Sequence, residues 1–187
     1  GGADRLLITG QLAGSNAPVG RTLAELGELT GMAPVDAAID VLRSGDARLA
    51  SFNMNPADIA AFAKQEWVVT GSDGSNGHPR KYASFPRKYR TYVAEKSVLP
   101  LAEFINRSTY LTARTLQLCQ RGALRPGYAA DIVVFDPETF GPVADFSNPA
   151  ELSEGVVHLF VNGARAIQNG QIDSQLHGRP LRRADCS

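Results

Sequence analysis

The sequence predicts an α/β fold in which strands and helices alternate, followed by a smaller all-β element. From Asp4 to about Cys119, short apolar runs typical of strands alternate with amphipathic stretches typical of helices. This alternation favours a parallel sheet covered by helices, either doubly wound or closed into a barrel. After "RGALRPGYA" the apolar period becomes that of strands, and the pair Asn162-Gly163 marks a tight hairpin. With 187 residues and 43% hydrophobic content, the chain is long enough to bury a core as one domain or parts of two.

The strands and helices of the first part follow from runs along the chain. Strands are expected at 5–9 (RLLIT), 47–52 (ARLASF) and 67–71 (WVVTG), and helices at 22–31, 34–45 and 56–65. The helix ends are marked locally. Asn55 is an N-cap residue before Pro56 at the first helical position, and Gly31 and Gly45 stand where helices end.

The first two helices are predicted to be amphipathic, with one buried face each. Their apolar residues recur at helical spacing: Leu23, Leu26 and Leu29 in one, and Val35, Ala38, Ile39 and Leu42 in the other.

The second part begins with a further helical stretch at 100–119. Its expected apolar face comprises Leu101, Phe104, Ile105 and Leu111. Short strands follow within 131–137 and 156–171, and the proline- and glycine-rich segment 136–155 between them is predicted to be an ordered surface loop.

Composition excludes several classes of function. Lys and Arg total 19 against 19 acidic residues, so no long-range field would attract nucleic acid or an anionic membrane. No apolar run approaches the ~18 residues of a membrane span, and the N-terminus lacks the layout of a signal peptide. The two cysteines, Cys119 and Cys186, argue against a disulfide framework and against a thiolate metal site. These features favour a cytoplasmic protein with a small-molecule or protein partner.

Asp73 follows the predicted strand 67–71 directly. Because chemistry in parallel βα folds lies at the carboxyl ends of strands, Asp73 is placed for catalysis. Its carboxylate could bind a metal or accept a proton from metal-bound water. The alternative is a Ser-Asp-Gly turn, in which the Asp side chain bonds backbone amides and Gly74 takes a positive φ. The local pattern leaves both open.

Three further residues are candidates for binding a substrate. His78 could reach a substrate or a metal, or be a hydrogen-bonded loop residue. Arg80 presents a guanidinium that matches a carboxylate with two parallel hydrogen bonds, although surface arginines are common. Met54, at another predicted strand end, could contact a ligand or fill an apolar gap. His158 and His177 are expected to be structural, and the sequence has no HxH, HExxH or CxxC spacing.

Four segments together resemble the C-terminal part of the N-acyl-D-amino-acid deacylases (D-aminoacylases) of the amidohydrolase superfamily. They are "WVVTGSDGSNGHPRKYASFPR", "PLAEFINRSTYLTAR", "RGALRPGYAADIVVFDP" and "LFVNGARAIQNGQ". The third and fourth are shared across the superfamily, whereas the SDG loop with "HPR" and "SFPR" is typical of the deacylases.

The resemblance implies the C-terminal part of a (β/α)8, TIM-like amidohydrolase barrel, joined to strands of a small β-sandwich. Residues 1–120 would form the last βα units of the barrel with the SDG loop. Residues 121–187 would form the C-terminal part of the sandwich and a tail.

The resemblance also implies a function. Such enzymes hydrolyse the amide of an N-acyl-D-amino acid with zinc-bound water, using one or two zinc ions. Asp73 matches the aspartate that contacts the metal or its water and carries the proton to the departing amine. Arg80 would hold the substrate's α-carboxylate, with Met54 and His78 near the substrate.

The family's metal-binding histidines lie in the N-terminal part of the barrel. The chain is therefore expected to be a fragment that needs its missing N-terminal half or associates with itself. Two alternatives remain: a cyclic-amide hydrolase of the dihydroorotase or hydantoinase type, and a non-catalytic fragment that only folds or binds a partner.

Overall fold

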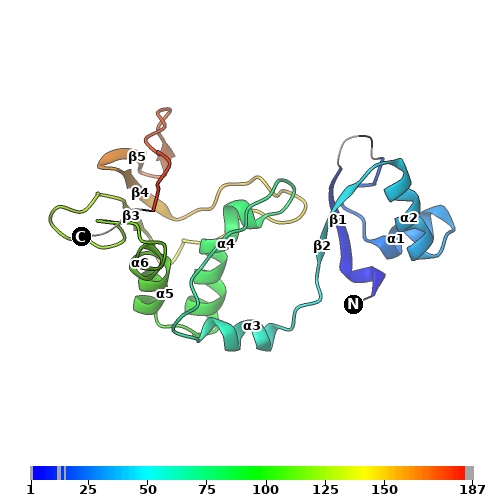
Figure 1. Ribbon diagram of the computed structural model, residues 1–187, viewed down its shortest axis with the longest axis horizontal. Helices are drawn as coiled ribbons and strands as arrows, with labels where there is room; N and C mark the ends of the chain where they lie inside the picture. The colour runs from blue at the N-terminus through cyan, green and yellow to red at the C-terminus, as the bar shows by residue number, and fades with distance from the viewer. Residues whose placement is uncertain (1, 12–13, 15, 184–187) are drawn as a thin grey trace. The chain divides into compact units, whose positions relative to one another are not determined.

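The computed structural model describes residues 2–11, 14 and 16–183 of the chain. Figure 1 shows the helices and strands, coloured from the N-terminus to the C-terminus. In chain order they are η1 (Ala3–Arg5), β1 (Leu6–Gln11), α1 (Leu23–Thr30), α2 (Pro34–Ser44), β2 (Ala47–Ser51), α3 (Pro56–Ala63), α4 (Arg80–Lys88), η2 (Tyr89–Glu95), α5 (Leu101–Ser108), α6 (Tyr110–Thr115), β3 (Ile132–Phe135), β4 (Val156–Val161), β5 (Ala164–Gln168) and β6 (Gln171–Ile172).

The chain forms two compact units, and each is assembled from segments that are distant in sequence. The first unit comprises Gly1–Ile59, Asp73–Tyr82 and Ala144–Glu151. The second comprises Ala60–Ser72, Ala83–Val143 and Leu152–Ser187.

The first unit contains a two-stranded sheet in which β1 and β2 run antiparallel, from Leu6 opposite Ser51 to Gln11 opposite Ala47. The predicted parallel arrangement is therefore wrong for this pair. The connection is not a single crossover helix. The segment 20–22 first runs back along β1, with an antiparallel bridge between Leu7 and Thr22, and two helices then follow before β2. Both strands and both helices form where the sequence predicts them.

Local signals set the ends of α1. Thr22 and Glu25 form a capping box, in which the Thr22 hydroxyl accepts the Glu25 N–H at 3.2 Å and the Glu25 carboxylate accepts the Thr22 N–H at 2.8 Å. The backbone hydrogen bond from Thr22 is the main reason why the pKa of Glu25 is lowered. Gly31 ends the helix at φ 68°, as predicted.

The apolar face of α2 differs from the predicted one. Ala37 and Val41 are buried, whereas Val35, Ile39 and Leu42 are 65%, 42% and 62% exposed. Helical periodicity sets the spacing of the residues on a buried face. Which face of α2 is buried depends on its packing against β1 and α1. The core of this unit also includes Ile8, which is fully buried.

The segment 67–71, predicted as a buried strand, has no strand structure. Trp67 is 71% exposed, and Val68 donates its N–H to Gln65 in a turn. A strand requires a neighbour that completes its backbone hydrogen bonds, and the described residues provide none for this segment.

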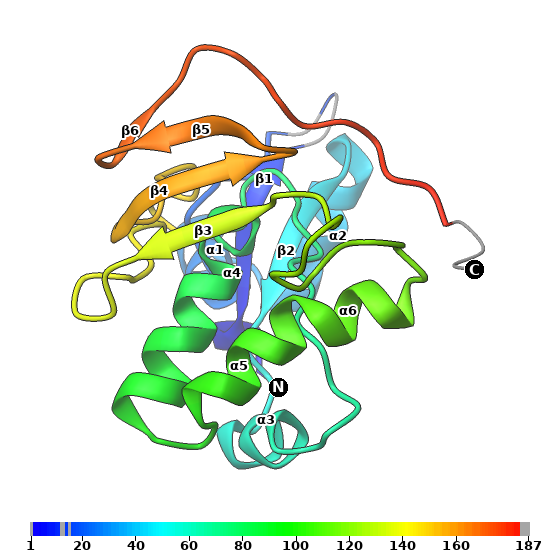
Figure 2. The ribbon, with the colours of Figure 1, turned by 90° about the vertical axis from the view of Figure 1, so that its left-hand side faces the viewer.

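The second unit contains a four-stranded antiparallel sheet in the order β3-β4-β5-β6, visible in Figure 2. The predicted hairpin between β4 and β5 is confirmed, because Asn162 and Gly163 both have positive φ, 52° and 82°. Positive φ at both central residues is the requirement of a type I′ turn. Asn169 and Gly170 make a similar turn between β5 and β6, at φ 49° and 76°.

A hydrogen-bonded network ties this hairpin to the start of β3. The Arg121 guanidinium pairs with Asp131 and donates to the Asn162 side chain at 2.6 Å. Asp131 in turn accepts the Asn162 N–H at 2.7 Å. The separate motifs "RG", "AD" and "VNG" thus meet in one hydrogen-bonded network.

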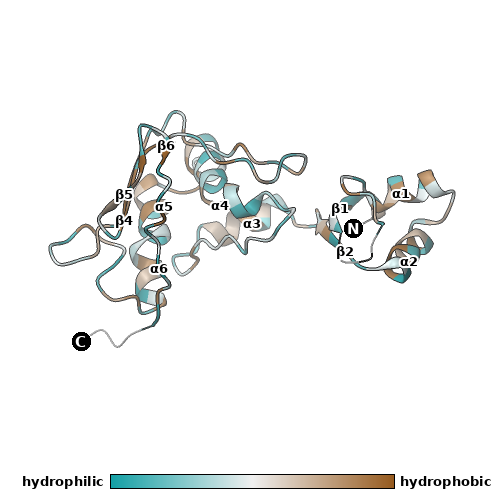
Figure 3. Ribbon diagram, turned by 90° about the horizontal axis from the view of Figure 1, so that it is seen from above, coloured by the Kyte–Doolittle hydropathy of each residue, from teal (hydrophilic) through white to brown (hydrophobic). Residues whose placement is uncertain are grey.

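The aromatic core of the second unit gathers around Tyr89, which packs against Phe104, Phe135 and Phe140 and donates its hydroxyl to Pro137 at 3.0 Å. Tyr89 begins η2, a π-helical segment that continues from α4. Helix α4 is not predicted by the sequence pattern. Its residues are largely hydrophilic (Figure 3) and include Pro86, which is unfavourable inside a helix, so the segment does not stand out as a helix in the sequence.

Arg107 on α5 anchors the end of α3. It is 3% exposed, and its guanidinium donates to the main-chain carbonyls of Ala63, Gln65 and Lys64 at 2.6, 2.8 and 3.4 Å. The Asn55 side chain accepts the Ala57 N–H at 2.9 Å at the other end, which confirms the predicted N-cap. The helix predicted over 100–119 is interrupted at Thr109, between α5 and α6.

Lys88, at the end of α4, donates to the Thr70 hydroxyl at 2.8 Å. Burial of its ammonium lowers the pKa of Lys88, and the nearby positive charge of Arg107 lowers it further.

Cys119 is disulfide-bonded, and one such bond is not the disulfide framework that the sequence argues against. Cys186 lies outside the described residues. Within the described parts of the chain, no helix is long and apolar enough to cross a membrane.

Candidate active site

The candidate site is the loop that runs from Asp73 to Arg80 in the first unit. The Nη2 atom of Arg80 lies 3.0 Å from Oδ2 of Asp73. The Arg80 side chain is 38% exposed and the Asp73 side chain 88%. Asp73 itself has a positive φ of 44°, and Gly74 does not. The turn alternative is thus wrong in detail, because the left-handed residue is the aspartate and the partner of its carboxylate is a guanidinium.

His78 holds the first residue of α4. Its Nδ1 atom accepts the backbone N–H of Arg80 at 3.1 Å, which places the N–H of a neutral imidazole at Nε2. The Arg80 guanidinium also lies 3.4 Å from the Ser75 hydroxyl. The loop thereby brings one carboxylate, one imidazole and one guanidinium together.

The loop is docked on the sheet of its own unit. Gly77 has φ 78°, and a Cβ atom there would lie 2.2 Å from the main-chain oxygen of Thr9 in β1. Arg48 in β2 donates to the Asn76 carbonyl at 3.4 Å. Only glycine fits position 77, since any side chain would push the loop off β1.

Replacing Gly77 with alanine is therefore expected to release this loop. Both the positive φ and the close approach to Thr9 oppose a Cβ atom. Limited trypsin cleavage after Arg80 and Lys81 should become faster in Gly77→Ala. The matched control is Gly71→Ala, because a Cβ at Gly71 meets nothing within 4 Å. Equal cleavage rates in the two variants would contradict the docking.

Two aromatic side chains adjoin the loop. The Phe146 ring packs edge-on against both Phe52 and His78, with ring centroids 4.9 Å apart in each pair. Phe52 follows directly after β2, and Phe146 comes from the segment 144–151.

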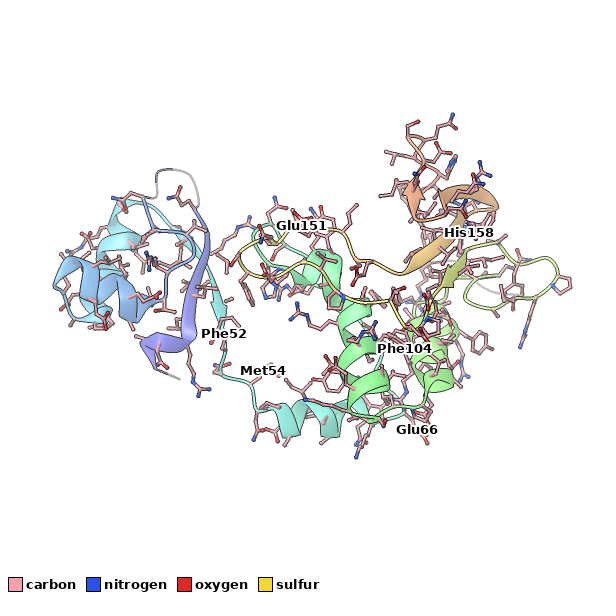
Figure 4. All side chains as sticks on the ribbon, turned by 180° about the vertical axis from the view of Figure 1, so that it is seen from behind. Phe52, Met54, Glu66, Phe104, Glu151 and His158 are labelled. Carbon is pink, nitrogen blue, oxygen red and sulfur yellow. The ribbon has the colours of Figure 1, made fainter. Side chains whose placement is uncertain are left out.

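The structure places the other candidates differently. Met54 is 66% exposed on the segment that leads from β2 to α3 (Figure 4). His158 lies in β4, where its Nδ1 accepts the Asn169 N–H at 3.4 Å. The carbonyl of His177 accepts from the Asn162 side chain at 3.0 Å. Both histidines thus make structural contacts in the second unit.

The described residues do not by themselves fit a metal site. Nowhere among them do three His, Cys, Asp or Glu side chains lie together so that they could hold an ion. Asp73 offers carboxylate oxygens to solvent, which suits one ligand position, while a zinc site in a protein needs three or four protein ligands.

Sequence reasoning missed Ser75, Gly77 and Phe146 at this site. The pair Asn76-Gly77 was a local signal for a tight turn. Nothing in the segment around Phe146 marks it as part of a site, because its contacts are with residues distant in sequence.

Comparison with known proteins places these observations in a family. The amidohydrolase family matches residues 4–167. An N-acyl-D-aspartate deacylase of Alcaligenes xylosoxydans xylosoxydans is 32% identical over an alignment that covers 98% of this chain and 37% of that protein.

Comparison with solved structures also finds deacylases. A D-aminoacylase with a binuclear metal centre has a TM-score of 0.84 and 33% identity, over 96% of this chain and 38% of that chain. An N-acyl-D-glutamate deacylase of Bordetella bronchiseptica, complexed with zinc and a phosphonate that mimics the tetrahedral intermediate, has a TM-score of 0.83 and 31% identity, over 97% of this chain and 38% of that chain. The chain spans just over a third of these relatives. The predicted α/β fold and the resemblance to the deacylases are confirmed.

Proposed function

We propose, from the premise that the chain belongs to the amidohydrolase family over residues 4–167, that it forms part of an enzyme that hydrolyses N-acyl-D-amino acids. The observation that carries the proposal is the loop in which Asp73 and Arg80 lie 3.0 Å apart. A carboxylate beside a guanidinium supplies the two groups that amide hydrolysis of an amino-acid derivative needs: a base for water and a cation for the α-carboxylate.

Asp73 is assigned the proton transfers. Its carboxylate takes a proton from the attacking water, whose oxygen bonds to the acyl carbon. The same proton then passes to the amine as the C–N bond breaks, and the products are a carboxylic acid and a free D-amino acid. Exposure of 88% keeps this carboxylate accessible to water and substrate.

Arg80 is assigned to the substrate's α-carboxylate. It already binds a carboxylate in this structure, that of Asp73. A substrate carboxylate would take the place of Asp73 on Arg80 and leave Asp73 to act on water. His78 holds the backbone of Arg80, and exposed Met54 is proposed to contact the substrate.

Zinc, as one or two ions, is the proposed metal, and it would make bound water more acidic. Because the described residues hold no complete ligand group and the chain spans 37% of its deacylase relative, the remaining ligands are proposed to come from the rest of the enzyme. In that whole enzyme, residues 1–120 would belong to the (β/α)8 barrel and 121–187 to the β-sandwich. By itself, the chain is proposed to need that N-terminal half or to self-associate.

A cytoplasmic location stays a prediction of the composition. A disulfide bond at Cys119 is unusual for a cytoplasmic protein. Cell fractionation would show whether the protein is in the cytoplasm or in an oxidising compartment.

The test is an assay of the chain reconstituted with the remaining part of the enzyme and zinc. We expect bound metal and hydrolysis of N-acetyl-D-amino acids, with no hydrolysis of dihydroorotate or hydantoins. Hydrolysis of the cyclic amides alone would favour the cyclic-amide alternative, and no hydrolysis of any amide would favour the non-catalytic one.

Substituting Arg80 with lysine is expected to raise KM about 10- to 100-fold, with a smaller change in kcat. Lysine keeps the charge but loses the paired donors that match a carboxylate. Steady-state kinetics with an N-acetyl-D-amino acid measure both constants. The control is Arg43→Lys in the last turn of α2, where the arginine is exposed. An unchanged KM in Arg80→Lys would remove Arg80 from the substrate site.

A further inference from the structure

The segment 144–151 lies more than sixty residues after the candidate site in the sequence, yet it belongs to the same compact unit as the loop 73–82. Its Phe146 ring packs against two other rings, those of Phe52 and His78. The interplanar angle is 74° with Phe52 and 66° with His78, and both centroid distances are 4.9 Å. Edge-to-face geometry at this distance is the favoured arrangement of aromatic pairs.

The backbone around Phe146 is held in place by a local turn. Asp145 Oδ1 accepts the N–H groups of Ser147 and Asn148 at 2.8 and 2.6 Å, and the Asp145 N–H donates to the Asn148 carbonyl at 3.3 Å. Ala144, just before it, is 1% exposed. An aspartate that bonds the amides two and three residues later fixes a turn, so the ring of Phe146 is presented from a defined backbone.

A chain of contacts leads from this ring to the charged pair. Phe146 restrains the plane of the His78 imidazole, and that plane sets the direction in which Nδ1 accepts the Arg80 N–H at 3.1 Å. Arg80 is the first residue of α4, and its guanidinium reaches Asp73 at 3.0 Å. A rotated imidazole would lose the hydrogen bond that holds the start of α4.

We infer that Phe146 is a positioning residue of the site, which holds His78 and, through it, the guanidinium of Arg80 in the orientation that binds the substrate carboxylate. The inference rests on the proposed function. The inference gives a functional role to the segment 144–151, which the sequence predicts only as part of a surface loop.

The test compares two variants of Phe146 in the reconstituted enzyme. Phe146→Leu keeps an apolar side chain but removes the ring, and Phe146→Tyr keeps the ring. Loss of the edge-to-face contact is expected to raise KM about 2- to 10-fold in Phe146→Leu, with a smaller change in kcat. Phe146→Tyr should restore a KM close to that of the wild type. The control is Phe85→Leu, since Phe85 is 38% exposed and belongs to none of the aromatic pairs among the described residues.

A second readout is independent of turnover. The ring current of Phe146 changes the NMR chemical shifts of the His78 ring protons. These chemical shifts should differ from those of the wild type in Phe146→Leu and match them closely in Phe146→Tyr. A purely structural role would lower the unfolding midpoint without separating KM from kcat.

Two results would overturn the inference, and they are distinguishable. If the wild type hydrolyses N-acyl-D-amino acids but Phe146→Leu has an unchanged KM, the positioning role alone is wrong. If the wild type hydrolyses none of them, the proposed function fails first and the positioning role with it.

Discussion

Replacing Asp73 with asparagine is expected to lower kcat by about 10²- to 10⁴-fold, which is the usual contribution of a general acid–base group. The amide keeps the shape of the side chain but cannot take a proton from water at neutral pH. The effect on folding should be small, because Asp73 is 88% exposed and its ion pair with Arg80 is solvated. Steady-state kinetics and thermal unfolding of the same variant separate the two effects.

The matched control for this substitution is Asp40→Asn. Asp40 lies on α2 in the same unit and is exposed, so its loss of charge should leave kcat unchanged. If Asp73→Asn retained most of the wild-type kcat, Asp73 would not be the general base, and the base would have to be sought elsewhere. If Asp73→Asn instead lost its fold, the ion pair with Arg80 would be structural.

Replacing Arg107 with methionine is expected to produce the largest loss of stability in the second unit. The guanidinium is 3% exposed and donates to three carbonyls at the C-terminal end of α3. These carbonyls have no partners within the helix, and a cation there also complements the helix dipole. Removing one member of a buried charged contact costs about 3 kcal/mol, equivalent to about 6–12 °C in the unfolding midpoint of a chain of this size.

Thermal unfolding monitored by circular dichroism measures this shift. Arg114→Met is the control, because Arg114 occupies the last turn of α6 and is exposed, so its loss should leave the midpoint almost unchanged. Glu103→Gln separates the contributions further. It removes the ion pair of Arg107 with half-exposed Glu103 but keeps the three carbonyl contacts, so its effect should be much smaller. Equal midpoints for Arg107→Met and Arg114→Met would contradict the anchoring of α3.

Sequence reasoning was most reliable where the signal was local. The N-cap at Asn55, the helix end at Gly31 and the hairpin turn at Asn162-Gly163 all form where the residues predict them. Each depends on the conformational preference of one or two residues and their neighbours in the chain. The ion pair between Asp73 and Arg80 was not predicted, although only six residues of one loop separate the two side chains.

The failures have a common cause. Strand 67–71, the direction of β2 relative to β1, and the buried face of α2 each depend on which element lies alongside. An apolar run indicates how much apolar surface a segment can bury. It does not indicate which neighbouring element will pack against that surface.

By itself, then, the sequence determined the α/β class, the ends of several helices, the hairpin and the acid, imidazole and guanidinium carried by the loop 73–80. The tertiary structure decided that Gly77 seats this loop on Thr9, that Arg107 closes the end of α3, and that Phe146 packs against His78. Local preferences act between chain neighbours. These three contacts join residues between 44 and 68 positions apart, so only the folded chain brings them within reach.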